Sequence, residues 1–136
     1  LLKRHRNVVE VTIDERTSRE TIEVIKKLAG LCDVILANGF IRVAAYKGSI
    51  DLTEEQLDLL RFLSTVEKPF VFTLFGSPYA LSFVPELPTS ILTYEYYPEA
   101  ERAALRAILG EIPFTGKLPI SLPNAYPIGH GLTTTR

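Results

Sequence analysis

The segment from Phe70 to Phe75 has the pattern of a strand, and five of its six residues are apolar. A short apolar run rich in aromatic and β-branched residues is typical of a strand that is covered on both faces. Both faces are covered where helices pack on each side of a parallel sheet. Gly76 and Pro78 then end the run. We therefore expect residues 70–75 to form the central strand of the fold.

The rest of the chain alternates between strand-like and helix-like patterns. Further strands are expected at residues 8–13, 32–37 and 90–94, and residues 40–46 are expected to form a short strand or a loop across the strand ends. Helices are expected over residues 17–29, from Asp51 or Thr53 to about residue 66, and over residues 98–109, with a short helix or turn over residues 79–87. This alternation predicts right-handed crossovers and a three-layer α/β sandwich with a mainly parallel sheet in flavodoxin-like order.

Helix boundaries are also marked in the sequence. Thr17 stands three residues before Glu20, which predicts a capping box, and Gly30 is a natural C-terminal stop. After Gly110 the helical pattern ends, and Pro119 and Pro123 exclude a central strand but permit an edge strand. We expect residues 1–7 to be a lead-in, residues 8–132 to form one domain with an irregular tail folded back on its surface, and residues 133–136 to follow it as a terminal tail.

Composition narrows the function classes. A formal net charge of -1 argues against a general nucleic-acid surface, since such a surface needs a basic excess. No apolar run approaches the length of a membrane span. The single cysteine cannot form an internal disulfide, and the chain has no methionine and begins Leu1-Leu2-Lys3. We therefore expect a piece of a longer protein that binds neither nucleic acid nor membrane.

In an open α/β sheet, ligands bind beyond the carboxyl ends of the strands. A dinucleotide site there needs glycines after the first strand, and residues 14–20 contain none. Thr17 and Ser18 could serve a phosphate loop, but helix capping explains them better. A phospho-acceptor receiver needs an aspartate where Phe75-Gly76 stands. We expect no cofactor.

Hydrolytic chemistry is also weakly supported by the residues themselves. Two carboxyls facing one cleft would suit a glycosidase, and the acids near strand ends are Asp14, Asp51 and Glu95. Such acids are more often caps and solvated loop residues. Ser77 lacks the flanking glycines of a nucleophile elbow, so a triad with His130 is not expected. Two distant histidines and one cysteine make no metal site.

The C-terminal motifs carry a more specific signal. The stretch Gly-Glu-Ile-Pro-Phe-Thr-Gly-Lys-Leu-Pro-Ile-Ser-Leu-Pro over residues 110–123 is followed by Tyr-Pro-Ile-Gly-His-Gly-Leu over residues 126–132. This pairing resembles the end of the C-terminal domain of glycoside hydrolase family 3, and residues 68–81 resemble the central strand and turn of the same domain. The resemblance covers essentially the whole chain and implies an α/β sandwich of the kind expected above.

The resemblance implies a two-domain glycosidase in which a preceding (β/α)8 barrel carries the aspartate nucleophile. In many members a glutamate acid/base comes from the loop after the second strand of the C-terminal domain. The matching residues 40–52 contain no glutamate: Ala44-Ala45-Tyr46-Lys47 stands there, and Asp51 reads as a helix cap. The chain is in this respect similar to the β-N-acetylglucosaminidase (β-hexosaminidase-like) branch, in which barrel residues do the acid/base work. That branch implies an accessory domain with no catalytic residue of its own, inactive when isolated.

Six residues are candidates to face the cleft or the barrel: Arg42, Tyr46, Lys47, Tyr79, Tyr96 and His130. For each, a second interpretation stays open. The two cations suit a solvated loop, the tyrosines suit burial as well as sugar stacking, and the histidine suits a hydrogen-bonded turn. The expected partner is the barrel, with carbohydrate as a further candidate. The alternative function is a standalone small-ligand-binding or protein-interaction α/β module.

Overall fold

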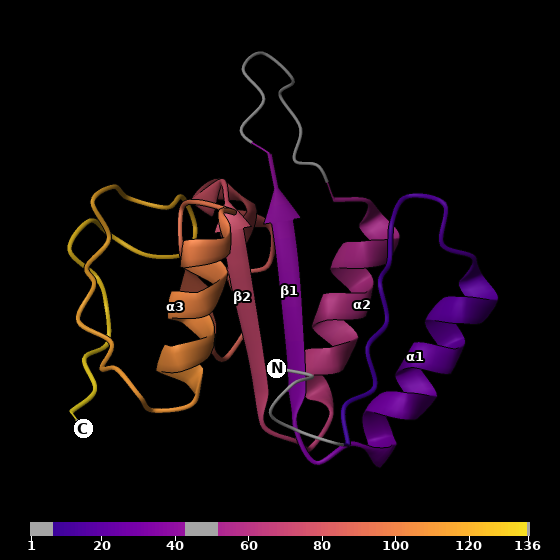
Figure 1. The fold of residues 1–136 in the computed structure, drawn as a ribbon. Helices are drawn as coiled ribbons and strands as arrows, with labels where there is room; N and C mark the ends of the chain where they lie inside the picture. Colours follow the sequence, from indigo (N-terminus) through magenta and orange to yellow (C-terminus); the bar gives the residue numbers. More distant parts are fainter. Residues whose placement is uncertain (1–6, 43–51, 136) are drawn as a thin grey trace.

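The computed structural model describes residues 7–42 and 52–135 as helices packed around a three-stranded parallel sheet (Figure 1). Its elements are α1 (Arg19–Leu31), β1 (Ile35–Ile41), α2 (Glu54–Thr65), β2 (Phe70–Gly76), the 3-10 helix η1 (Pro78–Phe83), β3 (Ser90–Leu92) and α3 (Pro98–Ile108). The strands lie in the order β1-β2-β3, and both pairs are parallel. The expected α/β fold with a parallel sheet centred on residues 70–75 is confirmed.

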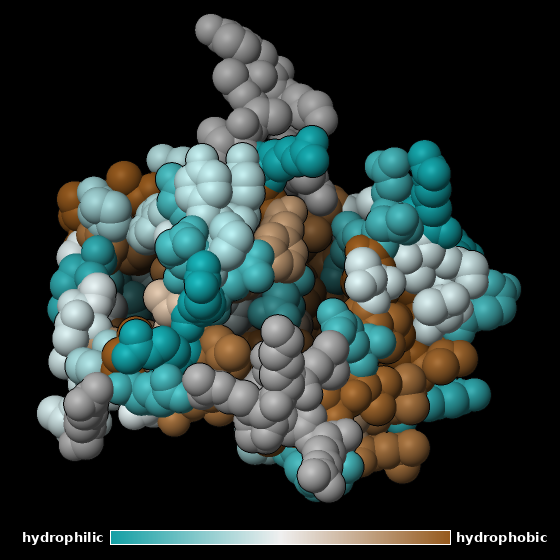
Figure 2. Space-filling view, in the orientation of Figure 1, coloured by the Kyte–Doolittle hydropathy of each residue, from teal (hydrophilic) through white to brown (hydrophobic). Residues whose placement is uncertain are grey.

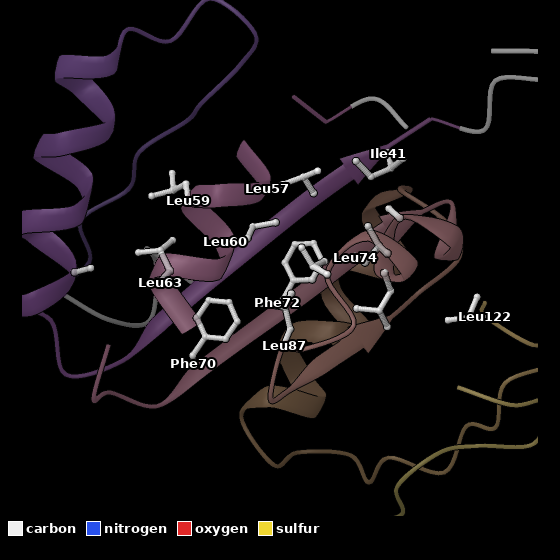
Figure 3. Packing of buried hydrophobic residues seen from close by; sticks show 14 of the residues in the cluster. Ile41, Leu57, Leu59, Leu60, Leu63, Phe70, Phe72, Leu74, Leu87 and Leu122 are labelled. Carbon is white, nitrogen blue, oxygen red and sulfur yellow. The ribbon is translucent and has the colours of Figure 1, made fainter. Parts of the chain in front are cut away.

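The two faces of β2 pack against different parts of the chain. Strand side chains alternate, so Phe70, Phe72 and Leu74 share one face, and they belong to the main hydrophobic cluster. Figure 3 shows leucines of α2 beside these residues, and the exposed fraction of Phe72 is 1% and that of Leu74 is 0%. Phe75 lies on the other face of β2 and is buried outside that cluster. Ala104 of α3 is also buried outside that cluster. α3 accordingly lies beside the strands on the side away from α2 (Figure 1).

The predicted strand over residues 8–13 is wrong. This segment is extended but belongs to no sheet, and Val9 and Val11 are exposed while Ile13 packs against the core. In a flavodoxin-like order a first strand would lie between β1 and β2, whereas β1 here pairs directly with β2. Apolar and polar residues alternate in this segment, but such a pattern carries no information about which neighbour would supply the hydrogen bonds of a strand.

Helix starts differ from expectation at α1 and agree at α2. Ser18 is the N-cap of α1, and its hydroxyl accepts from the Thr21 N–H at 3.3 Å. The predicted capping box at Thr17 is wrong, because the Thr17 hydroxyl instead accepts from the Asp14 N–H at 2.9 Å. α1 also continues through Gly30 to Leu31. For α2, Thr53 is the cap and forms a reciprocal capping box with Gln56.

β1 is longer than predicted at its carboxyl end. The strand starts at Ile35 and continues through Asn38 and Gly39, which were expected to end it. Gly39 lies close to the neighbouring strand: a Cβ there would be 3.0 Å from the Phe72 ring, which would have to shift to admit a larger residue. Phe40 and Ile41 complete β1, and residues 43–51 lie outside the described part of the chain.

The residues after α3 form an irregular but hydrogen-bonded tail. Gly110 follows the end of α3 with a φ of +72°, as its position after the helix predicts. The Leu118 N–H donates to the His130 carbonyl, and the Leu122 N–H donates to the Tyr126 carbonyl, both at 2.8 Å. Leu118 and Leu122 are buried in the main cluster. The expected folding-back of the tail is therefore confirmed.

Candidate functional site

The carboxyl ends of β1 and β2 form the edge of the sheet at which a site was expected. Gly76, the last residue of β2, has a φ of +96°, and a Cβ there would lie 2.0 Å from the Ile41 carbonyl oxygen. That same oxygen accepts the Ser77 N–H at 3.0 Å. A side chain at position 76 would thus break the junction that holds the two strand ends together, which explains the glycine.

Four aromatic residues gather at this edge. The Phe40 ring stacks on the Phe75 ring with centroids 4.7 Å apart and planes 7° from parallel. The Tyr96 and Tyr97 rings lie 5.8 Å apart, and Tyr96 approaches within 3.6 Å of the Cβ position of Gly76. Phe75 is buried, but the exposed fractions are 57% for Phe40, 49% for Tyr96 and 60% for Tyr97. We call these four residues the edge aromatic surface.

A hollow of about 230 Å³ opens beside this surface. It is lined by Phe40, Ile41, Arg42, Tyr96 and Glu101, so it joins the end of β1 to the segment before α3 and to α3 itself. Arg42 and Glu101 are both exposed and carry opposite charges. Exposed aromatic rings flanked by a cation and an anion suit the docking of a polypeptide segment or a sugar ring, because stacking and charged hydrogen bonds are available together.

The predicted site residues are distributed unevenly. The hollow brings Arg42 and Tyr96 together. Tyr79 is half exposed on η1 and does not line the hollow. His130 lies in the tail, where its ring stacks on Tyr126 with centroids 4.3 Å apart and its carbonyl accepts the Leu118 N–H. These contacts favour the structural interpretation of His130. Tyr46 and Lys47 lie outside the described residues.

Sequence reasoning missed two features of this edge. Phe40 was assigned to a separate extended piece after Asn38-Gly39, so its pairing with Phe75 was not anticipated. The parallel register places these two residues opposite each other, and that register is visible only once β1 is known to continue past Gly39. Glu101 was not singled out in the sequence, because no local pattern sets it apart from Glu99.

A second hollow, of about 290 Å³, lies between residues 13–22 and the start of α2. Five of its polar lining residues form local hydrogen bonds: Asp14, Thr17, Ser18, Thr53 and Gln56. The Asp14 carboxylate accepts the Arg16 N–H at 2.9 Å and the Thr17 hydroxyl at 3.2 Å. Hydrogen bonds from its own backbone N–H and from the Ser18 hydroxyl lower the pKa of Glu20. These are the contacts expected of acids and hydroxyls at the start of a helix. We therefore interpret the residues around this hollow as helix caps rather than as a binding site.

Within residues 7–42 and 52–135, no helix has the length and apolar character needed to cross a membrane. The same residues bring together no group of three or more histidine, cysteine or acidic side chains suited to a metal ion. Comparison of the chain with protein-family models, with curated proteins and with solved structures finds no match. The family 3 resemblance therefore rests on the motifs in the sequence and stays a prediction.

Proposed function

We propose that this chain is the accessory C-terminal α/β domain of a family 3 glycoside hydrolase of the β-N-acetylhexosaminidase type. In this proposal the domain packs on a (β/α)8 barrel that carries the catalytic groups, and it shapes one wall of the cleft. The observation that carries the proposal is the edge aromatic surface. Its exposed rings lie where an α/β sheet commonly presents its binding groups, beyond the carboxyl ends of parallel strands.

The composition of this surface favours a protein partner. Tyrosine, phenylalanine and arginine are enriched at protein interfaces, and central aromatic residues carry a large share of the binding energy. Phe40, Tyr96 and Tyr97 supply the rings, and Arg42 supplies a cation at the rim of the hollow. A barrel surface that covers the rings and offers a carboxylate to Arg42 would complement both features.

The proposal assigns the chemistry to the barrel. Hydrolysis of a glycosidic bond ordinarily needs two carboxyl groups roughly 5–9.5 Å apart across the bond. Among the described residues that line the edge hollow, Glu101 is the one carboxylate. We therefore expect Glu101 to act as a polar rim residue rather than as half of a catalytic pair.

The first experiment measures release of chromophore from a chromogenic N-acetylglucosaminide by the purified chain, with an intact family 3 β-N-acetylhexosaminidase as the positive control. We expect the chain alone to match the buffer blank. Turnover far above the blank that is abolished by Glu101→Gln would overturn the accessory role. A thermal-shift screen of nucleotides and flavins distinguishes the alternative, because a clear rise in Tm with one of them would favour a ligand-binding module.

A further inference from the structure

The two charged residues of the edge hollow do not pair with each other. Arg42 and Glu101 carry opposite charges, yet in the described part of the chain neither side chain forms an ion pair or a hydrogen bond. By contrast, Glu99 of the same helix binds Arg102 at 2.9 Å. The Arg42 guanidinium and the Glu101 carboxylate are therefore both open to charged groups that come from outside this domain.

The hollow also has an aromatic lining. The exposed fractions are 57% for Phe40 and 49% for Tyr96, and the Phe75 ring covers one face of Phe40 at a centroid distance of 4.7 Å, so the opposite face is open. The face of an aromatic ring attracts a cation that lies within about 6 Å of its centroid. In Figure 2, hydrophobic and hydrophilic side chains lie next to each other where β1 ends, so stacking and charged contacts are available on one surface.

The side chains of the hollow favour an incoming cation over an anion. A cation would be attracted by the Glu101 carboxylate and by the faces of Phe40 and Tyr96, and repelled by Arg42. An anion would be attracted by Arg42 and repelled by the other three side chains. Arg42 then remains for a carboxylate of the same partner. A surface that carries a cation beside an acid thus complements both charges of the hollow.

The size of the hollow and the shape of its lining select the kind of cation. A volume of about 230 Å³ is below the roughly 300–1,000 Å³ of small-molecule pockets, so the hollow suits one side chain rather than a cofactor. A guanidinium is planar, stacks on aromatic faces and donates two parallel hydrogen bonds to a carboxylate. A lysine ammonium is a compact, strongly hydrated charge without that geometry. Arginine is therefore the residue that uses the rings and the carboxylate together.

We propose that the edge hollow receives an arginine side chain from the (β/α)8 barrel. Its guanidinium stacks on the exposed rings of Phe40 and Tyr96 and donates a pair of hydrogen bonds to the Glu101 carboxylate, while an acidic side chain of the barrel binds Arg42. This contact rests on the proposed function, because it takes the barrel as the partner. It adds the chemistry by which the barrel is recognised and gives Glu101 a role in binding.

The first test is calorimetric binding of this chain to the barrel domain of the parent gene. Glu101→Gln removes the charge but keeps the shape of the side chain, and we expect the Kd to rise about tenfold. Glu101→Lys sets a like charge against the incoming arginine, and we expect a rise of about 100-fold. Glu99→Gln is the matched control, because Glu99 lies on the same helix but binds Arg102 and does not line the hollow. Its Kd should equal that of the parent chain.

A double-mutant cycle then identifies the partner residue. Each arginine on the barrel surface is replaced by alanine, and each variant is titrated with the parent chain and with Glu101→Gln. We expect one arginine whose removal weakens binding to the parent chain about tenfold more than binding to Glu101→Gln, since the two residues share one interaction. The surface lysines of the barrel, replaced in the same way, should show no such coupling.

The outcomes separate this contact from the proposed function. Binding that is weakened by Tyr96→Ala but unchanged by both Glu101 variants would overturn the arginine contact and leave the accessory role standing. Coupling of Glu101 to a barrel lysine, or to no barrel residue, would overturn the contact in the same way. Absence of any binding to the barrel would overturn the proposed function and the contact together.

Discussion

Replacing Gly76 by alanine tests the junction on which the candidate site is built. Gly76 has a φ of +96°, and its new Cβ would lie 2.0 Å from the Ile41 carbonyl oxygen. The unfavourable backbone conformation costs about 1–3 kcal/mol. Displacing that oxygen also breaks its hydrogen bond with the Ser77 N–H, which contributes about 1 kcal/mol. We therefore expect Gly76→Ala to lower the free energy of unfolding by about 3 kcal/mol.

Gly110→Ala is the matched control. Gly110 also has a positive φ, of +72°, but nothing lies within 4 Å of its Cβ position, so only the conformational cost of about 1 kcal/mol applies. Urea unfolding followed by circular dichroism compares the two variants. With a slope of about 2 kcal/mol/M, the midpoint should fall by about 1.5 M for Gly76→Ala and about 0.5 M for Gly110→Ala. Equal midpoints for the two variants would refute the proposed contact between the strand ends.

Two further predictions concern single side chains. The Tyr94 hydroxyl is buried without a partner among the described residues, and burial raises its pKa. The folded state therefore holds the phenol proton more tightly than the unfolded state, and this contribution is present below about pH 10 and lost as pH rises through the folded pKa. Tyr94→Phe should be at least as stable as the parent at pH 8 and gain on it above pH 10; a loss of more than about 1 kcal/mol at pH 8 would reveal a hydrogen bond. Thr53→Ala should cost about 1 kcal/mol by removing the α2 cap, whereas Thr53→Ser should retain most of it, and equal urea midpoints for the two would count against the capping box.

The parts of the fold that follow from local chemistry were predictable. Residues 70–75 are apolar on both sides and form the central strand, and the hydroxyl of Thr53 has the spacing to Gln56 that starts a helix. The predictions of the fold that failed depend on residues that are distant in the sequence. Val8–Ile13 is extended as its pattern indicates, but whether an extended segment joins a sheet is decided by neighbours that the pattern does not name.

The candidate site shows the same division. Arg42 and Tyr96 could be nominated because they follow strands, and the structure brings them to one hollow. The stack of Phe40 on Phe75 could not be nominated, because it depends on the register between β1 and β2. His130 belongs to the specific motif at residues 126–132, yet its ring stacks on Tyr126 within the tail, which favours a structural role.

The most direct measurement is a calorimetric titration of this chain with the barrel domain that the family 3 resemblance implies in the parent gene. We expect binding, and a weakening of about 30-fold for Tyr96→Ala or Tyr97→Ala, which corresponds to loss of an interface aromatic worth about 2 kcal/mol. Phe62→Ala is the control, since Phe62 is a partly exposed aromatic residue late in α2, away from the edge hollow. Binding that depends on Tyr96 and Tyr97 but not on Phe62 supports the accessory role. No binding, or equal loss in all three variants, contradicts it.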